Sequence, residues 1–209
     1  GYMAEEYVKV LTHLELEFKI IGRSDKSSKH FLSTYGIKII TGGIEQYLLA
    51  TEEVPQYAIV CSQVESLSAI SKKLIIYGVK QILIEKPGAL ATSELLELKN
   101  LALHNESHVF IGYNRRFYSS LLYLKNILKK EVLTSVQFEI TEWSHTFDTS
   151  LYSEEVRQKW VYANTSHVID MVINIIGEID QLSSYHSGGL SWHNSASRFA
   201  CSGISKSGI

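Results

Sequence analysis

The feature that most constrains the fold is a series of short apolar segments that alternate with helical patterns in the middle of the chain. Three segments are nearly continuous in apolar residues and have the length of buried strands: Tyr57–Cys61, Gln81–Ile84 and His108–Gly112. A helical pattern from about Glu65 to Tyr77 and another from Ser93 to Asn105 separate them. Apolar strands joined through helices form parallel sheets covered on both faces. We therefore predict a doubly wound α/β domain.

The first fifty residues continue this alternation. Apolar residues between Tyr7 and Leu14 recur at helical spacing, and Phe18–Ile21 is predicted to be a short buried strand. A helix is expected over Asp25–Tyr35, capped by Ser24 or Asp25 and closed by Gly36, with a further short helix over Ile44–Ala50.

The pattern changes after Asn114, and a domain boundary is expected near Arg115. The later segments predict two helices and three stretches of strand in an α+β arrangement with a mainly antiparallel, open sheet: helices over Ser119–Lys130 and Ser166–Ile176, and strands over Leu133–Thr141, Leu182–Tyr185 and Arg198–Cys201. We therefore expect a dinucleotide-binding domain over residues 1–115, lacking its first strand, and a second α+β domain over residues 116–209, which is incomplete.

Composition excludes several classes of function. The 209 residues carry a formal net charge of −2 without a basic run, so no nucleic-acid partner is expected. The apolar runs are too short to span a bilayer, and no N-terminal signal peptide is recognisable. Cys61 and Cys201 are the only cysteines, which favours a reducing, cytoplasmic location.

Two segments near the N-terminus could contact a dinucleotide. Gly1–Ala4 can be the end of a G-x-G-x-x-A fingerprint, in which the glycine lets the backbone approach a pyrophosphate; the alternative is an ordinary helix start. Gly22, Arg23 and Ser24 follow the next expected strand, where an acidic residue would favour NAD and an arginine suits a 2′-phosphate. The alternative for this segment is a solvated turn.

Two further segments carry groups suited to proton chemistry. Lys86, within Glu85-Lys86-Pro87 at a strand end, could stabilise alkoxide charge on a reacting hydroxyl; the alternative is a surface lysine before a turn. His167, Asp170 and Asn174 share one face of an apolar helix. That face is either solvent-exposed or lines a pocket in which His167 acts as acid and base. No metal is expected, because no second His or Cys has ligand spacing there.

Four segments in order resemble the Gfo/Idh/MocA oxidoreductases, the glucose–fructose oxidoreductase and inositol dehydrogenase family. They are Gly1–Ala4, the strand–helix–strand run from Tyr57 to Pro87, the segment Ile111–Phe117 and the helix start Ser166–Asp170. The resemblance implies a Rossmann domain followed by an open antiparallel sheet. It also implies NAD(P)-linked hydride transfer at a carbinol carbon of a sugar, cyclitol or nucleotide sugar, in a homodimer or homotetramer. Gly22, Arg23 and Ser24 favour NADP over NAD as the cofactor.

The resemblance also assigns roles to residues. Lys86 and His167 are expected to be catalytic and to reach into one cleft, and Asn114, Arg116 and Asp170 to bind substrate, although Asp170 could instead orient the imidazole. The cofactor is expected against Gly1, Tyr2, Met3, Gly22, Arg23, Ser24, Cys61, Ser62, Glu85 and Lys86. Many members carry Asp where this chain has Ala163, and Cys61–Ser66 lacks the usual Pro and His. The alternative function is therefore a catalytically weakened member that binds nucleotide or sugar as a sensor or partner subunit.

Overall fold

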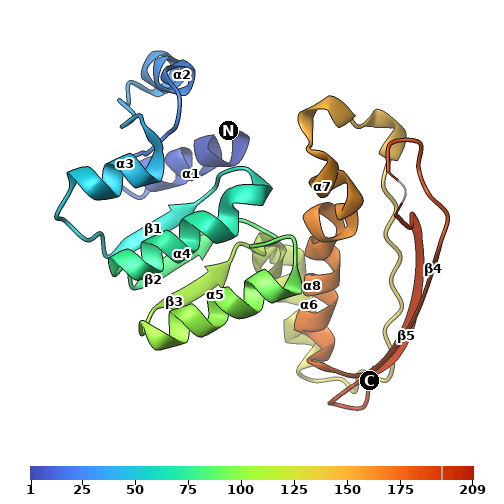
Figure 1. Cartoon of the computed structure of the whole chain (residues 1–209). Coiled ribbons are helices and arrows are strands. Elements are labelled where there is room, and N and C mark those ends of the chain that lie inside the picture. The colour runs from blue at the N-terminus through green and yellow to red at the C-terminus, as the bar shows by residue number, and fades with distance from the viewer. Residues whose placement is uncertain (194) are drawn as a thin grey trace. The chain divides into compact units, whose positions relative to one another are not determined.

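The computed structural model describes residues 1–193 and 195–209 and divides into two compact units, Gly1–Ile111 and Gly112–Ile209 (Figure 1). The first unit contains five α-helices and three strands among its residues: α1 (Tyr2–His13), α2 (Asp25–Tyr35), α3 (Gly43–Ala50), β1 (Tyr57–Val60), α4 (Leu67–Tyr77), β2 (Gln81–Ile84), α5 (Thr92–His104) and β3 (His108–Ile111).

The three strands of the first unit form one parallel sheet in the order β1-β2-β3. Their last residues, Val60, Ile84 and Ile111, are paired across the sheet, so the carboxyl ends of all three strands lie at one edge. Ile82 and Ile84 are fully buried beneath side chains of α4 and α5, including Leu67 and Leu98. The predicted strand–helix alternation is confirmed, and α4 and α5 pack against the apolar residues of the central strand β2.

Local signals at helix ends also behave as the sequence predicts. Ser24 accepts a hydrogen bond from the backbone N–H of Ser27 and so caps α2. Gly36 ends the helix in the left-handed conformation, with φ of 69°, and donates to the carbonyl of Leu32.

The predicted strand at Phe18–Ile21 is wrong in extent. Only one parallel bridge forms, between Ile21 and Ile40, and the flanking segment is partly exposed. The backbone N–H of Gly22 donates to the carbonyl of Ile40. The carbonyl of Gly22 accepts from the backbone N–H of Gly43 at the start of α3. Because the chain turns away directly afterwards, no longer ladder develops.

The second unit combines helices with a hairpin-like pair of strands. Its elements are α6 (Ser119–Leu128), the short α7 (Glu154–Gln158), a π-helical turn (Val161–Thr165), α8 (Ser166–Ile176), β4 (Ile179–Ser187) and β5 (Arg198–Ser205). β4 and β5 pair antiparallel, as expected for the second domain, and they extend beyond the predicted strands. Among the described residues, no helix is long and apolar enough to cross a membrane.

The strand predicted at Leu133–Thr141 is wrong. The alternation of Val136 and Phe138 with polar neighbours predicted a strand with one buried face. Both side chains are exposed, however, at 37% and 48%, and no strand is assigned to this described segment. Alternation alone cannot make a strand, since a strand also needs a neighbour to pair with its backbone groups.

Candidate functional site

The carboxyl edge of the parallel sheet brings together two of the predicted cofactor segments. Cys61 and Ser62 follow β1, and Glu85, Lys86 and Pro87 follow β2. The backbone N–H of Glu85 donates to the carbonyl of Val60 at 2.8 Å, which holds the two strand ends beside each other. Open α/β sheets bind ligands beyond this edge.

Glu85 is anchored by a residue that sequence reasoning missed. The Glu85 side chain is buried, with 8% exposed, and the hydroxyl of Tyr7 in α1 donates to its Oε1 at 2.7 Å. Burial is the main cause that raises the pKa of the Tyr7 phenol. The hydrogen bond to Glu85 and the negative charge of Glu85 raise it further. The helical spacing of Tyr7 predicts only a position on an apolar helix face, whereas the hydroxyl of a partly buried tyrosine usually has a polar partner.

Lys86 lies in a tight turn at the end of β2. The N–H of Gly88 donates to the carbonyl of Glu85 at 3.0 Å, and the peptide bond before Pro87 is cis, as in a type VI turn. Gly88 has φ of 84°, and a Cβ there would lie 2.6 Å from Cδ1 of Ile111. Lys86 is half-buried between buried neighbours, so its backbone is held at the sheet edge.

Cys61 shares the electrostatic environment of this edge. Burial is the main cause that raises the pKa of its thiol; the charge of Glu85 raises it further, while the amino group of Gly1 lowers it. Gly1 is the N-cap residue of α1, and Tyr2 and Met3 form its first turn. The predicted residues Cys61 and Glu85 are therefore neighbours at the sheet edge.

The segment Gly22–Ser24 has partners that the sequence did not predict. Arg23 donates through Nη2 to the side-chain oxygen of Gln63 at 2.6 Å, so it lies beside the segment that follows β1. The hydroxyl of Ser24 caps α2 and contacts the hydroxyl of Ser27 at 3.1 Å. The contact with neutral Gln63 places no opposite charge against the Arg23 guanidinium, whereas the Ser24 oxygen is partly committed to the helix cap.

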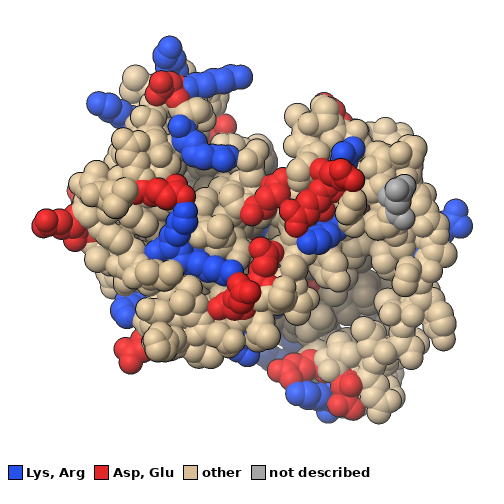
Figure 2. Space-filling model, viewed as in Figure 1, with Lys and Arg blue, Asp and Glu red and all other residues tan. Residues whose placement is uncertain are grey.

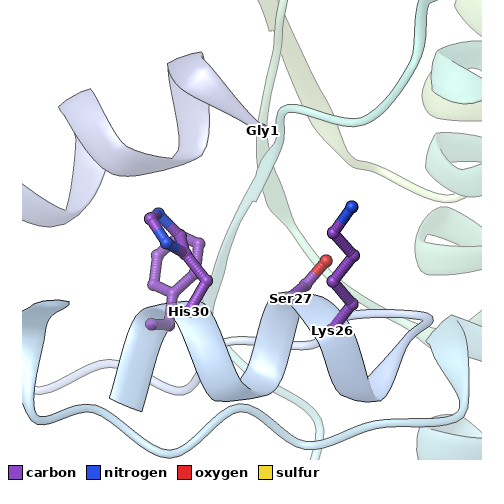
Figure 3. A pocket seen from close by; sticks show the side chains of 5 residues that line it. Gly1, Lys26, Ser27 and His30 are labelled. Carbon is purple, nitrogen blue, oxygen red and sulfur yellow. The ribbon is translucent and has the colours of Figure 1, made fainter. Parts of the chain in front are cut away.

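An open cavity of about 190 Å³ lies between the start of α1 and one face of α2 (Figure 3). It is lined by Gly1, Lys26, Ser27, His30 and Phe31. Figure 2 shows basic side chains over α2, whose sequence includes Lys26 and Lys29. Lys26, Ser27 and His30 were not predicted as site residues, although their helical spacing places them on one face beyond the Ser24 cap.

In the second unit, the predicted substrate residues Arg116 and Asp170 bind each other. Arg116, in the 3-10 turn Asn114–Phe117, donates through Nε to Oδ2 of Asp170 at 2.7 Å and through Nη2 to Oδ1. The Asp170 side chain is 11% exposed. The hydrogen bond to Asp170 is the main cause that raises the pKa of Arg116. Both Asp170 oxygens thus accept from one guanidinium, an arrangement that the sequence did not indicate.

His167 occupies the first turn of α8 and is half-buried. The ring of Tyr113 meets its imidazole edge-on, with centroids 5.8 Å apart and an interplanar angle of 78°. Further along α8, Asn174 accepts a hydrogen bond from Lys125 of α6. The polar stripe of α8 therefore packs against other segments of the second unit rather than facing water alone. Lys86 belongs to the first unit, so its convergence with His167 stays a prediction.

No family model matches the chain, and no curated protein matches its sequence. Several solved structures share its fold. The WlbA dehydrogenase of Chromobacterium violaceum, solved with NADH and UDP-GlcNAcA, is 16% identical with a TM-score of 0.79, covering 100% of this chain and 62% of its own. The WlbA dehydrogenase of Bordetella pertussis, solved with the same two ligands, is 10% identical with a TM-score of 0.81. The match covers 100% of this chain and 65% of that dehydrogenase.

A third similar structure is GenD2 from gentamicin A biosynthesis, solved with NAD. It is 15% identical with a TM-score of 0.75, and the match covers 100% of this chain and 61% of GenD2. The chain thus spans about three fifths of the length of these structures. The expected fold, a Rossmann-type parallel sheet followed by an antiparallel unit, is confirmed.

The contact between Tyr7 and Glu85 can be tested by Tyr7→Phe. A hydrogen bond to a charged group contributes about 1.5–3 kcal/mol, so the free energy of unfolding at pH 7 should fall by about that amount. The folded pKa of Tyr7 is raised above its usual 10.0, so the wild type loses stability as the pH rises above that value. The difference in the free energy of unfolding between the wild type and Tyr7→Phe should therefore become smaller at alkaline pH.

Urea unfolding between pH 7 and pH 11 measures both effects. Tyr57→Phe is the matched control, because Tyr57 is 67% exposed, and it should unfold like the wild type. A Tyr7→Phe variant no less stable than this control would show that the contact contributes nothing.

Proposed function

We propose that the chain is the dinucleotide-binding part, with a portion of the substrate-binding part, of an NAD(P)-dependent oxidoreductase. It transfers a hydride to or from the carbinol carbon of a sugar, cyclitol or nucleotide sugar. The observation that carries the proposal is the turn at Glu85–Gly88, which holds Lys86 at the carboxyl edge of a parallel sheet. Similar structures that share this fold are dehydrogenases solved with NADH or NAD.

The residues around α1 and α2 suit an anionic dinucleotide. The cavity beside Gly1 lies at a helix N-terminus, which favours phosphate, and Lys26 adds a positive charge. No carboxylate occupies positions 22–24, and Arg23 lies beside the segment after β1. Residues 1–115 would hold the cofactor through the predicted residues at Gly1–Met3, Gly22–Ser24, Cys61–Ser62 and Glu85–Lys86.

Lys86 and His167 would divide the proton chemistry. The Lys86 amine would hold the substrate hydroxyl and stabilise its alkoxide character, and the His167 imidazole would take or return the proton. The nicotinamide, when bound, accepts or supplies the hydride. Residues 116–209, together with Asn114, would bind substrate. Arg116 and Asp170 would act as one unit there, because Arg116 donates to both Asp170 oxygens.

A second candidate function is a catalytically weakened sensor or partner subunit. Position 163, where many relatives of the resembled family have Asp, carries a buried alanine with 7% exposed. A carboxylate at this position is therefore not available to His167. Binding of nucleotide without turnover on any sugar would favour this second function.

The relative affinity of the protein for NADPH and NADH tests the role of Arg23. We expect NADPH to bind about ten- to a hundredfold more tightly than NADH, because one charge-assisted contact to the 2′-phosphate is worth about 1.5–3 kcal/mol. Arg23→Ala should remove this preference in a fluorescence titration with both nucleotides. Lys129→Ala, an exposed cation of the second unit, is the control and should retain the preference. Equal affinities in the wild type would refute the NADPH preference.

The catalytic roles are tested by Lys86→Ala and His167→Ala. Loss of general acid–base help should lower turnover by about 10²–10⁴-fold. The affinity of His167→Ala for cofactor should stay near that of the wild type. Turnover is measured with NAD⁺ and NADP⁺ on glucose, myo-inositol and UDP-GlcNAcA. The matched controls Lys99→Ala and His104→Ala change exposed residues of α5 and should react like the wild type. Wild-type turnover in either catalytic variant would contradict the mechanism.

We also propose a homodimer or homotetramer joined through β4 and β5, in a reducing cytoplasm where Cys61 and Cys201 stay free thiols. Large apolar side chains on these two strands are exposed: Leu182 at 64%, Tyr185 at 74%, Phe199 at 53% and Ile204 at 48%. A partner subunit would remove them from water. Light scattering should show an oligomer at micromolar concentration and a smaller species for Leu182→Glu. A wild-type monomer would contradict this assembly.

A further inference from the structure

Glu142 gathers three side-chain donors from a short stretch of the second unit. Its Oε2 accepts from the indole Nε1 of Trp160 at 2.7 Å. Its Oε1 accepts from Nδ2 of Asn164 at 2.9 Å and from the hydroxyl of Thr165 at 2.7 Å. Glu142 itself is half-buried and lies about twenty residues earlier in the chain, so the carboxylate joins two distant segments.

The three donors lie at the two ends of the π-helical turn Val161–Thr165. Trp160 precedes the turn and is buried with 8% exposed, while Asn164 and Thr165 are its last two residues. A π-helical turn is rare and needs support from its surroundings, and such turns often occur at functional sites. The carboxylate of Glu142 therefore links the beginning and the end of this turn.

The turn runs directly into the first turn of α8, which carries His167. Thr165 is two residues before His167, and Asn164 is three residues before it. Three residues after His167, Asp170 is held by Arg116. His167 thus lies between two anchored positions, one bound to Glu142 and the other to Arg116.

We propose that Glu142 is a positioning residue for His167. Its carboxylate fixes the π-helical turn and thereby sets where α8 begins and how the imidazole is presented. This inference rests on the proposed function for its catalytic consequence. It also accounts for how the His167 segment is held in a chain whose position 163 is an alanine: the carboxylate reaches the two following residues from another segment.

Two substitutions at Glu142 distinguish the hydrogen bond from Trp160 from those donated by Asn164 and Thr165. Glu142→Ala removes all three hydrogen bonds. Glu142→Gln keeps an oxygen that can accept from Asn164 and Thr165, but places an amide N–H₂ against the Trp160 indole, which can only donate. The glutamine variant should therefore retain most of the His167 geometry, and the alanine variant should not. Glu139→Ala is the control, because Glu139 is an exposed carboxylate three residues earlier.

The imidazole of His167 can be followed directly in the full chain labelled with ¹⁵N-histidine. Its signals are identified by their loss in His167→Ala. We expect Glu142→Ala to shift or broaden them, Glu142→Gln to change them less, and Glu139→Ala to leave them unchanged. Unchanged His167 signals in folded Glu142→Ala would overturn the proposal. If Glu142→Ala does not fold, Thr165→Val removes one donor at similar volume, and its His167 signals decide in the same way.

Kinetics with the panel substrate that supports turnover tests the catalytic consequence. Misplacing a catalytic group by about 1 Å can cost about 10²-fold, so Glu142→Ala should lower kcat about 10–100-fold with KM and cofactor affinity little changed. If Glu142 acts through His167, the double variant should be no slower than His167→Ala alone. A further loss in the double variant, or wild-type kcat in Glu142→Ala, would overturn the proposal. Wild-type kcat in His167→Ala would instead overturn the proposed function, while the imidazole signals would still report on Glu142.

Discussion

The first unit depends on the parallel register of β1, β2 and β3. Since Val60, Ile84 and Ile111 are paired across the sheet, the residues that follow each strand emerge at one edge. The hydrogen bond from Glu85 to Val60 continues this register by one step, and the turn closed by Gly88 then holds Lys86 there. A shift of register would separate Cys61 from Glu85 and leave no common edge for a ligand.

Anchoring of buried or partly buried carboxylates recurs in both units. Glu85 accepts from Tyr7 of α1, Asp170 from Arg116, and Glu142 from Trp160, Asn164 and Thr165. A carboxylate withdrawn from water is costly unless donors surround it, so each one fixes the segments that supply its donors. In this chain the fixed segments are those that carry the proposed functional groups, namely the end of β2 and the start of α8.

The contacts of the predicted site residues refine the functional hypothesis. Arg23 lies against the neutral amide of Gln63, a contact that does not compensate the guanidinium charge that a phosphate would meet. Asp170 accepts from Arg116 at both oxygens, which fixes the orientation of its carboxylate one helical turn after His167. The Tyr113 ring packs edge-on against His167 and limits the rotation of the imidazole from one side.

The sequence by itself determined the elements whose signals are local. The Ser24 cap and Gly36 placed α2, the apolar run Gln81–Ile84 placed β2, and Gly177 ended α8, because capping and burial act over a few residues. It also indicated Lys86 and His167 through short motifs. Only the tertiary structure decided the partners of those residues. Tyr7 is 78 positions from Glu85, and Asp170 is 54 from Arg116. The same holds for Leu133–Thr141, whose alternation was correct as a pattern but found no strand to pair with. Pairing between distant segments depends on which surfaces folding brings together, and the local sequence carries no record of it.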